Sequence, residues 1–213
     1  MTKIFIEAKS NKTSEYHFLQ AIISIFFPAI EVEFIFMDGI GNLYNETNLN
    51  QIKLAQETGE QVIVFADADS VAKGYGYVKR KKEIDNGIAT NAVSFPYFIY
   101  PNNQDDGDVE TLMEAAALYA PNKIFFDCYE DYETCLKGVK DSNGESIYNV
   151  PSLKGKVYAY AAAQTIYDTQ QKQRIPLIKK MGCGDWLFNN KSYWNLYVDA
   201  LQPLKDFLAI NLK

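Results

Sequence analysis

The chain has 213 residues, a formal net charge of −6 and 47% hydrophobic residues, which suits one large globular domain or one domain with an appendage. The negative charge argues against a broad nucleic-acid surface, because phosphate binding normally needs clustered Lys and Arg side chains. No apolar tract approaches the roughly 18 residues of a membrane span, and no signal sequence is recognisable, so we expect a cytoplasmic protein with no membrane partner. The three cysteines form no CxxC pair, which indicates neither a disulfide framework nor a zinc site.

The first hundred residues alternate between strand-like and helix-like segments. Four apolar, β-rich segments predict strands at residues 3–7, 31–37, 61–66 and 94–100. Three segments of helical periodicity lie between them, at residues 15–27, 49–58 and 71–86. Pro96 favours a sheet edge for the fourth strand. The order β-α-β-α-β-α-β predicts an α/β fold with a parallel four-stranded sheet and helices on both faces.

The second half of the chain has a different pattern. A polar loop follows the fourth strand, and helical segments are predicted at residues 109–119, 127–137, 156–167 and 193–212. We therefore expect an α/β core over residues 1–125 and a helical C-terminal cap over residues 126–213, packed on the core as one structural unit.

Acidic residues stand where three of the predicted strands end. Glu7 closes the first strand, Asp38 the second, and Asp67 and Asp69 the third. In an α/β domain with parallel strands, these strand ends face one crevice where ligands bind. Carboxylates gathered there repel one another unless a cation joins them, and Mg²⁺ prefers oxygen ligands and keeps waters for substrate phosphates. Asp38 precedes Gly39, so an ordinary turn is the other interpretation of that residue.

The chemistry that such a set can perform is metal-assisted phosphoryl transfer. Mg²⁺ neutralises developing charge and positions the attacking oxygen, and a nearby carboxylate acts as general base. An Asp-x-Asp pair such as Asp67 and Asp69 is weak evidence alone, because Asp is common at helix N-caps. Together with Glu7 on the first strand, the set is more specific.

Several other features have two interpretations each. The basic stretch 79–82 is either a solvated helix face or a patch that steers phosphates. The acidic residues between Asp105 and Glu110 either favour a helix N-terminus or complete a metal site. Lys9 is either a phosphate-binding or a surface lysine, and His17 fits a helix face better than a general base. The aromatic residues fit core packing, although those beside the acidic run can stack on bases.

Several stretches resemble a known family. They are Ile6-Glu7-Ala8-Lys9, Phe65-Ala66-Asp67-Ala68-Asp69-Ser70, residues 101–110, Lys156-Val157-Tyr158-Ala159-Tyr160, Tyr193-Trp194 and residues 201–208. The order of a strand-ending Glu, a glycine turn and an Asp-x-Asp-Ser resembles the Toprim domain of topoisomerases, primases, OLD-type nucleases and ribosomal-RNA maturases. More closely, the chain resembles the DUF3226 family of small bacterial proteins with a Toprim-like core.

The resemblance implies roles for particular residues. Glu7 would act as the acid/base group and metal ligand, with Lys9 beside it. Asp67 and Asp69 would hold Mg²⁺ or Mn²⁺, and Asp108 would complete the site from the loop after strand four. The family start is usually Glu-Gly-Lys followed by acidic residues, whereas this chain has Ala8, and Ser10 and Asn11 at the acidic positions. That departure favours one metal ion over two.

Two functions remain open from the sequence. The first is a Toprim-like, Mg²⁺-dependent phosphodiester hydrolase or phosphoryl-transfer protein that acts on DNA or RNA. The second is a catalytically lapsed Toprim-like module that binds a nucleotide or a protein partner. The acidic balance and the missing carboxylates after Glu7 favour the second.

Overall fold

The computed structural model describes residues 1–121, 124–176 and 186–212. The chain forms two compact units, one made of Met1–Leu112 with Asp199–Lys213 and the other of Met113–Val198. The boundary expected after residue 125 falls inside the second unit. The C-terminal helix belongs to the first unit, together with the four-stranded sheet.

The first unit is built on a parallel four-stranded sheet, as the sequence predicts. Its strands are β1 (Thr2–Ile6), β2 (Val32–Phe36), β3 (Gln61–Asp67) and β4 (Tyr97–Tyr100). Their order is β2-β1-β3-β4, and every neighbouring pair is parallel. Strand β4 begins directly after Pro96 and lies at one edge of the sheet, as Pro96 indicates. β1 and β3 are central, so the residues that follow them meet in the middle of the sheet's carboxyl edge.

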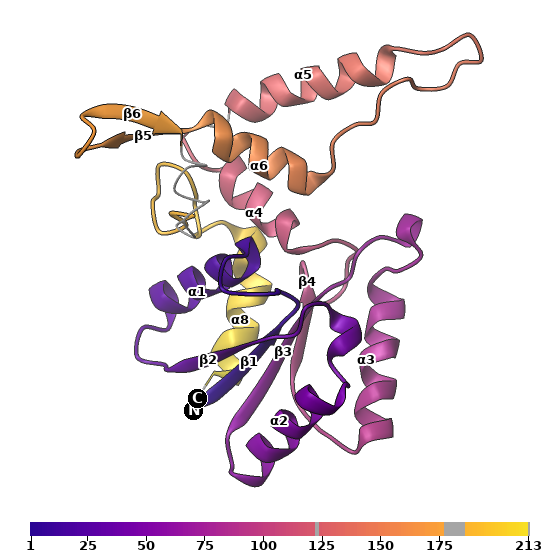
Figure 1. Ribbon diagram of the computed structural model, residues 1–213, viewed down its shortest axis with the longest axis vertical. Helices are drawn as coiled ribbons and strands as arrows, with labels where there is room; N and C mark the ends of the chain where they lie inside the picture. Colours follow the sequence, from indigo (N-terminus) through magenta and orange to yellow (C-terminus); the bar gives the residue numbers. More distant parts are fainter. Residues whose placement is uncertain (122–123, 177–185, 213) are drawn as a thin grey trace. The chain divides into compact units, whose positions relative to one another are not determined.

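Helices cover both faces of this sheet (Figure 1). They are α1 (Ser14–Phe26), α2 (Glu46–Glu57), α3 (Tyr77–Asn91) and α8 (Gln202–Asn211). Val64 of β3 packs in one buried cluster with Ile52 of α2 and Ile84 of α3. The next residue, Phe65, faces the other way and contacts Phe207 of α8, with ring centroids 5.8 Å apart. Alternation along β3 therefore supplies apolar side chains to two helical layers.

The helix predicted over residues 71–86 is displaced in the structure. Residues Val71–Lys73 form a 3₁₀ turn that ends at Gly74, whose φ of 80° is left-handed and stops helix growth. The α-helix begins only at Tyr77, where the Asp106 carboxylate accepts the backbone N–H at 2.8 Å. That loop carboxylate satisfies one of the unpaired donors at the start of α3.

The second unit contains helices and a hairpin. Helix α4 (Val109–Leu118) starts in the first unit and ends in this one, which also holds α5 (Ile124–Gly138), α6 (Leu153–Ala163), β5 (Thr165–Asp168) and β6 (Gln173–Pro176). Strands β5 and β6 are antiparallel. The helix predicted over residues 156–167 is wrong at its end, because β-branched Thr165 and Ile166 begin the hairpin instead. Tyr160 lies at the centre of the unit and donates its hydroxyl to the Tyr193 carbonyl at 2.6 Å.

The helix predicted over residues 193–212 is wrong over residues 193–201. A 3₁₀ turn spans Asp199–Leu201, and α8 begins at Gln202 with Pro203 in its first turn. Proline is accommodated there, because the first N–H groups of a helix have no intrahelical partner, whereas it would disrupt the interior of a longer helix. None of the helices in the described ranges is long and apolar enough to cross a membrane.

Candidate functional site

Glu7 joins the ends of three strands. It directly follows β1, and its Oε1 accepts a hydrogen bond from the backbone N–H of Asp67, the last residue of β3, at 2.8 Å. Its Oε2 accepts from the backbone N–H of Ile40, in the turn after β2, at 3.3 Å. The in-register pairing of β1 with β3 makes this contact possible. The structure thus brings together two of the acidic residues that the sequence singles out.

The surroundings of Glu7 and Asp67 disfavour two negative charges. Burial raises the pKa of Glu7, and the hydrogen bond from Asp67 and the charge of Arg80 offset part of that rise. Burial also raises the pKa of Asp67 well above its usual range, and the neighbouring carboxylates Glu7 and Glu15 raise it further. One Asp67 carboxylate oxygen accepts from the Val109 backbone N–H at 2.9 Å. A cation at this place would relieve the repulsion between these carboxylates.

Asp69 points to a different set of partners from Asp67. Its backbone, at a φ of 59°, pairs with Gly107 through two hydrogen bonds of 2.7 and 2.9 Å. Its carboxylate forms ion pairs with Arg80 at 3.3 Å and with Lys73 at 3.4 Å. The two aspartates of the Asp-x-Asp pair therefore do not converge, since Asp67 is held by the start of α4 and Asp69 by the start of α3.

Arg80 is the buried cation of this region, and the sequence does not identify it. Its side chain is only 6% exposed. The guanidinium donates to the Asp67 carbonyl at 2.9 Å, to Asp69 and, at 3.0 Å, to Glu83. The basic stretch 79–82 is thus neither a uniform solvated face nor a uniform phosphate patch. Arg80, the second residue of this stretch, points inward and binds the Asp67 backbone and the Asp69 side chain at the end of β3.

Glu15 is a further carboxylate of the site that the sequence analysis assigns only to a helix. It lies in the first turn of α1, is 8% exposed, and accepts the Ala8 backbone N–H at 2.9 Å. Burial, and then the charge of Glu7, raise its pKa to about 8. Its other oxygen is buried and has no hydrogen-bond partner within the described part of the chain. The segment after β1 therefore contributes a buried carboxylate that interacts electrostatically with Glu7.

Tyr100 adds a second unpaired polar atom. It pairs in register with Asp67, its side chain is fully buried, and its hydroxyl has no hydrogen-bond partner among residues 1–121, 124–176 and 186–212. Burial, together with the charges of Glu15 and Asp67, raises its pKa well above the usual range. Glu110 is also buried and its charge acts on Asp67 and Glu15.

These donors fit a partial magnesium site better than a complete one. In the described ranges, no group of three or more His, Cys, Asp or Glu side chains is close enough to hold a metal ion. Mg²⁺ is often bound by only one or two carboxylates, with waters and substrate phosphates completing its coordination. Glu7 and Asp67 match that arrangement. Asp69 does not, because Arg80 and Lys73 already neutralise it.

The remaining predicted site residues are held mainly by other partners, although the charge of Asp108 also raises the pKa of Asp67. Asp108 accepts from the backbone N–H and the hydroxyl of Thr111, both at 3.2 Å, as a residue at a helix start does. Lys9 is 79% exposed, and its ammonium is 3.9 Å from the carboxylate of Asp38. Asp38 itself has a φ of 55° in the turn after β2. His17 packs edge-on against the Tyr16 ring in α1, with centroids 5.0 Å apart.

A cavity of about 540 Å³ opens beside Glu7 at the carboxyl end of the sheet. Residues from the turn after β2, from the segment after β3 and from α3 enclose it: Glu7, Gly39, Ile40, Gly41, Leu43, Tyr44, Asp69, Tyr75, Arg80, Glu83 and Ile84. This is the position at which open α/β sheets bind ligands.

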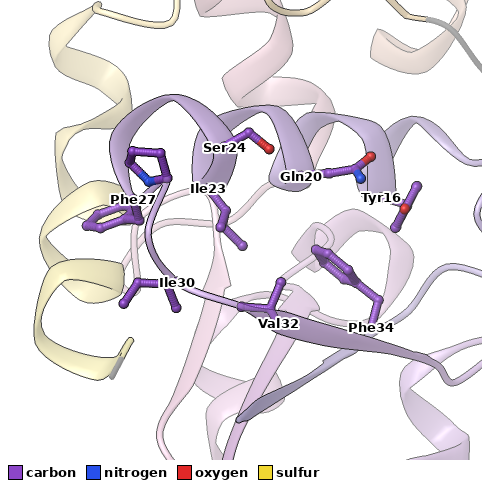
Figure 2. Close-up of a pocket in the computed structure, with 9 residues that line it drawn as sticks. Tyr16, Gln20, Ile23, Ser24, Phe27, Ile30, Val32 and Phe34 are labelled. Atoms are coloured by element: carbon purple, nitrogen blue, oxygen red, sulfur yellow. The ribbon is translucent and has the colours of Figure 1, made fainter.

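A second cavity, of about 320 Å³, lies between α1 and the edge strand β2 (Figure 2). Ile23 and Phe27 of the helical side and Val32 and Phe34 of the strand line it, and its polar lining comes from Tyr16, Gln20 and Ser24. It contains no carboxylate and no cationic side chain, so it offers no acid/base chemistry.

No family model, no curated protein and no solved structure matches the chain.

Proposed function

We propose that the chain is a Toprim-like, Mg²⁺-dependent phosphodiester hydrolase or phosphoryl-transfer protein that acts on nucleic acid. One observation carries this proposal: Glu7 and Asp67 meet at the carboxyl ends of two central parallel strands, 2.8 Å apart from Oε1 to backbone nitrogen. Both have raised pKa values because of burial. Carboxylate oxygens are the ligands that hard cations prefer, and a carboxyl group with a raised pKa is suited to exchange protons.

The two residues would divide the chemistry between them. A bound Mg²⁺ supplies charge neutralisation at the phosphate and an oriented water. Asp67 would hold the ion from the side of β3, and Glu7 would share it. Because the pKa of Glu7 is raised, its carboxyl can accept a proton from the attacking water and return one to the leaving oxygen. The two backbone N–H groups that bind Glu7 fix the orientation of its carboxyl group.

A second candidate is a module that keeps the fold and binds a nucleotide or a protein without catalysis. The observation that favours it is the pairing of Asp69 with Arg80 and Lys73, which removes one member of the Asp-x-Asp pair from metal binding. The overall charge of −6 also disfavours tight binding to a long polyanion.

A cleavage assay separates the two candidates. Single-stranded and duplex DNA and RNA are incubated with the protein and Mg²⁺ or Mn²⁺, and the same substrates with Glu7→Gln and Asp67→Asn. Asp38→Asn is the matched control, because Asp38 is a 64% exposed carboxylate outside the acidic group. Hydrolase activity requires metal-dependent cleavage that both site variants lose by about 100-fold or more and that the control keeps. Absence of cleavage on all substrates, with the variants still folded, would refute the hydrolase proposal and favour the non-catalytic binding module.

A further inference from the structure

The cavity beside Glu7 combines three kinds of lining. Apolar and aromatic side chains form one part of it, among them Ile40, Tyr44 and Tyr75. Carboxylates of Asp69 and Glu83 form a second part, and the guanidinium of Arg80 lies between them, 3.3 and 3.0 Å away. Small-molecule sites typically have this composition, an apolar enclosure with a few convergent polar groups.

The size and position of the cavity restrict its ligand. About 540 Å³ lies within the ~300–1,000 Å³ of small-molecule sites and suits one nucleotide unit of a strand. Glu7 belongs both to the cavity lining and, through its contact with Asp67, to the acidic group. A flat ring bound in the cavity would therefore be next to a phosphate bound at the strand ends.

The charges restrict the ligand further. Three carboxylates and one guanidinium line the cavity, so hydrogen-bond acceptors outnumber cationic donors. An anionic group is disfavoured there, whereas a neutral ring that donates hydrogen bonds is favoured. Among nucleobases, an exocyclic amino group supplies such donors, and carboxylates accept from it in known base recognition. The Lys79 ammonium and the Arg80 guanidinium lie 4.7 and 4.9 Å from the centroid of the Tyr75 ring, and the 42% exposure of this residue leaves ring surface for stacking.

We propose that this cavity is a nucleoside subsite that takes an amino-bearing base, stacked on Tyr75 and bonded to Glu83. The subsite rests on the proposed function, because it would hold the nucleotide whose phosphate reaches Glu7 and Asp67. Glu83 is the better acceptor of the two carboxylates, since Asp69 is 29% exposed with two cationic partners and Glu83 is 44% exposed with one.

The test uses uncharged nucleosides in the presence of EDTA, so that neither a phosphate nor a metal contributes. Guanosine is compared with inosine, and cytidine with uridine, by ligand-observed NMR and calorimetry. In both pairs the amino-bearing member is expected to bind about tenfold more tightly, the magnitude of one good charged hydrogen bond. Equal affinities within each pair, or no binding by any nucleoside, would overturn the proposal.

Variants locate the binding. Tyr75→Ala is expected to lose binding of every nucleoside by about tenfold, and Tyr148→Ala, an exposed tyrosine of the second unit, to change nothing. Glu83→Gln is expected to abolish the amino preference and to retain stacking, whereas Glu57→Gln, an exposed Glu at the end of α2, keeps both. Unchanged binding in Tyr75→Ala would place the nucleoside elsewhere and refute the subsite.

Asp67→Asn separates the subsite from the proposed function. In EDTA this variant is expected to bind nucleosides as the wild type does, because Asp67 does not line the cavity. Nucleoside binding without any metal-dependent cleavage would support the subsite and overturn the hydrolase. Cleavage that depends on Asp67, without nucleoside binding, would support the hydrolase and overturn the subsite.

Discussion

The buried Glu15 makes stability depend on pH in a way that can be calculated. Its pKa is about 8 in the folded protein and about 4.5 when unperturbed. Each pKa unit is worth about 1.36 kcal/mol, so the difference corresponds to about 5 kcal/mol of stabilisation at low pH, of which about 3 kcal/mol has been lost at pH 7. Between these two pH values the folded protein binds a proton that the unfolded chain has released. The proton's stabilising contribution is complete below about pH 4.5 and is lost as the pH rises through 8.

Glu15→Gln removes this titration and keeps the shape of the side chain. In EDTA, we expect the free energy of unfolding of the wild type to fall between pH 5 and pH 8, approaching ~1.4 kcal/mol per pH unit from this residue. The variant lacks that component. It should match the wild type near pH 4 and exceed its stability by about 3 kcal/mol at pH 7. Glu57→Gln, on the exposed end of α2, should follow the wild type throughout.

The assay must report on the first unit. Both tryptophans, Trp186 and Trp194, lie in the second unit, so their fluorescence follows the wrong part of the chain. Hydrogen exchange of amides in β1 and β3, measured across the pH range with correction for intrinsic exchange rates, reports the required stability. Parallel pH profiles for the wild type and Glu15→Gln would refute the argument that Glu15 is buried and protonated at neutral pH.

Three further predictions concern the same unit. Arg80→Met should lower the free energy of unfolding of the first unit by about 3–5 kcal/mol in urea, because the carboxylates around a 6% exposed cation lose their partner. The control Lys79→Met, at an exposed position, should change it by no more than about 0.5 kcal/mol. Equal effects of the two substitutions would contradict the anchoring role of Arg80. Leu208→Ala, at a fully buried position of α8, should lower the free energy of unfolding by about 2–5 kcal/mol. The control Ile210→Ala, at a position 72% exposed, should lower it by less than about 1 kcal/mol. A similarly small loss for Leu208→Ala would mean that α8 does not stabilise the sheet. Mg²⁺ binding should release protons, and the Mg²⁺ affinity should increase from pH 6 to pH 8, because the ion displaces protons from carboxyl groups with raised pKa values. Calorimetry in buffers of different ionisation enthalpy measures the number of protons released, and Mg²⁺ binding without proton release would contradict the prediction.

The fold was predictable from the sequence because its signals are local. Apolar runs such as Gln61–Asp67 are long enough to identify buried parallel strands, and their alternation with helices defines the class of fold. The errors occur where one residue's conformation decides the outcome. Gly74 in the left-handed region delays α3 to Tyr77, and the hairpin that begins at Thr165 replaces the end of a predicted helix.

The site was predictable only in part, for a physical reason. Strand ends identify Glu7 and Asp67, since neighbouring parallel strands bring them together whatever the loops do. The roles of Glu15 and Arg80 depend on burial, which a charged residue in a helix does not reveal by its spacing. The divergence of Asp69 from Asp67 depends on the turn at its φ of 59° and on its pairing with Gly107. Such details require the tertiary structure.

Binding of a divalent cation by Asp67 is the most direct test of the central claim, that the strand-end acids form a metal site. Mn²⁺ in place of Mg²⁺ allows the bound ion to be counted by electron paramagnetic resonance. The account predicts one Mn²⁺ bound by the wild type and by Asp38→Asn, with affinity reduced at least tenfold in Asp67→Asn and in Glu7→Gln. Equal Mn²⁺ affinity in all four proteins would contradict it.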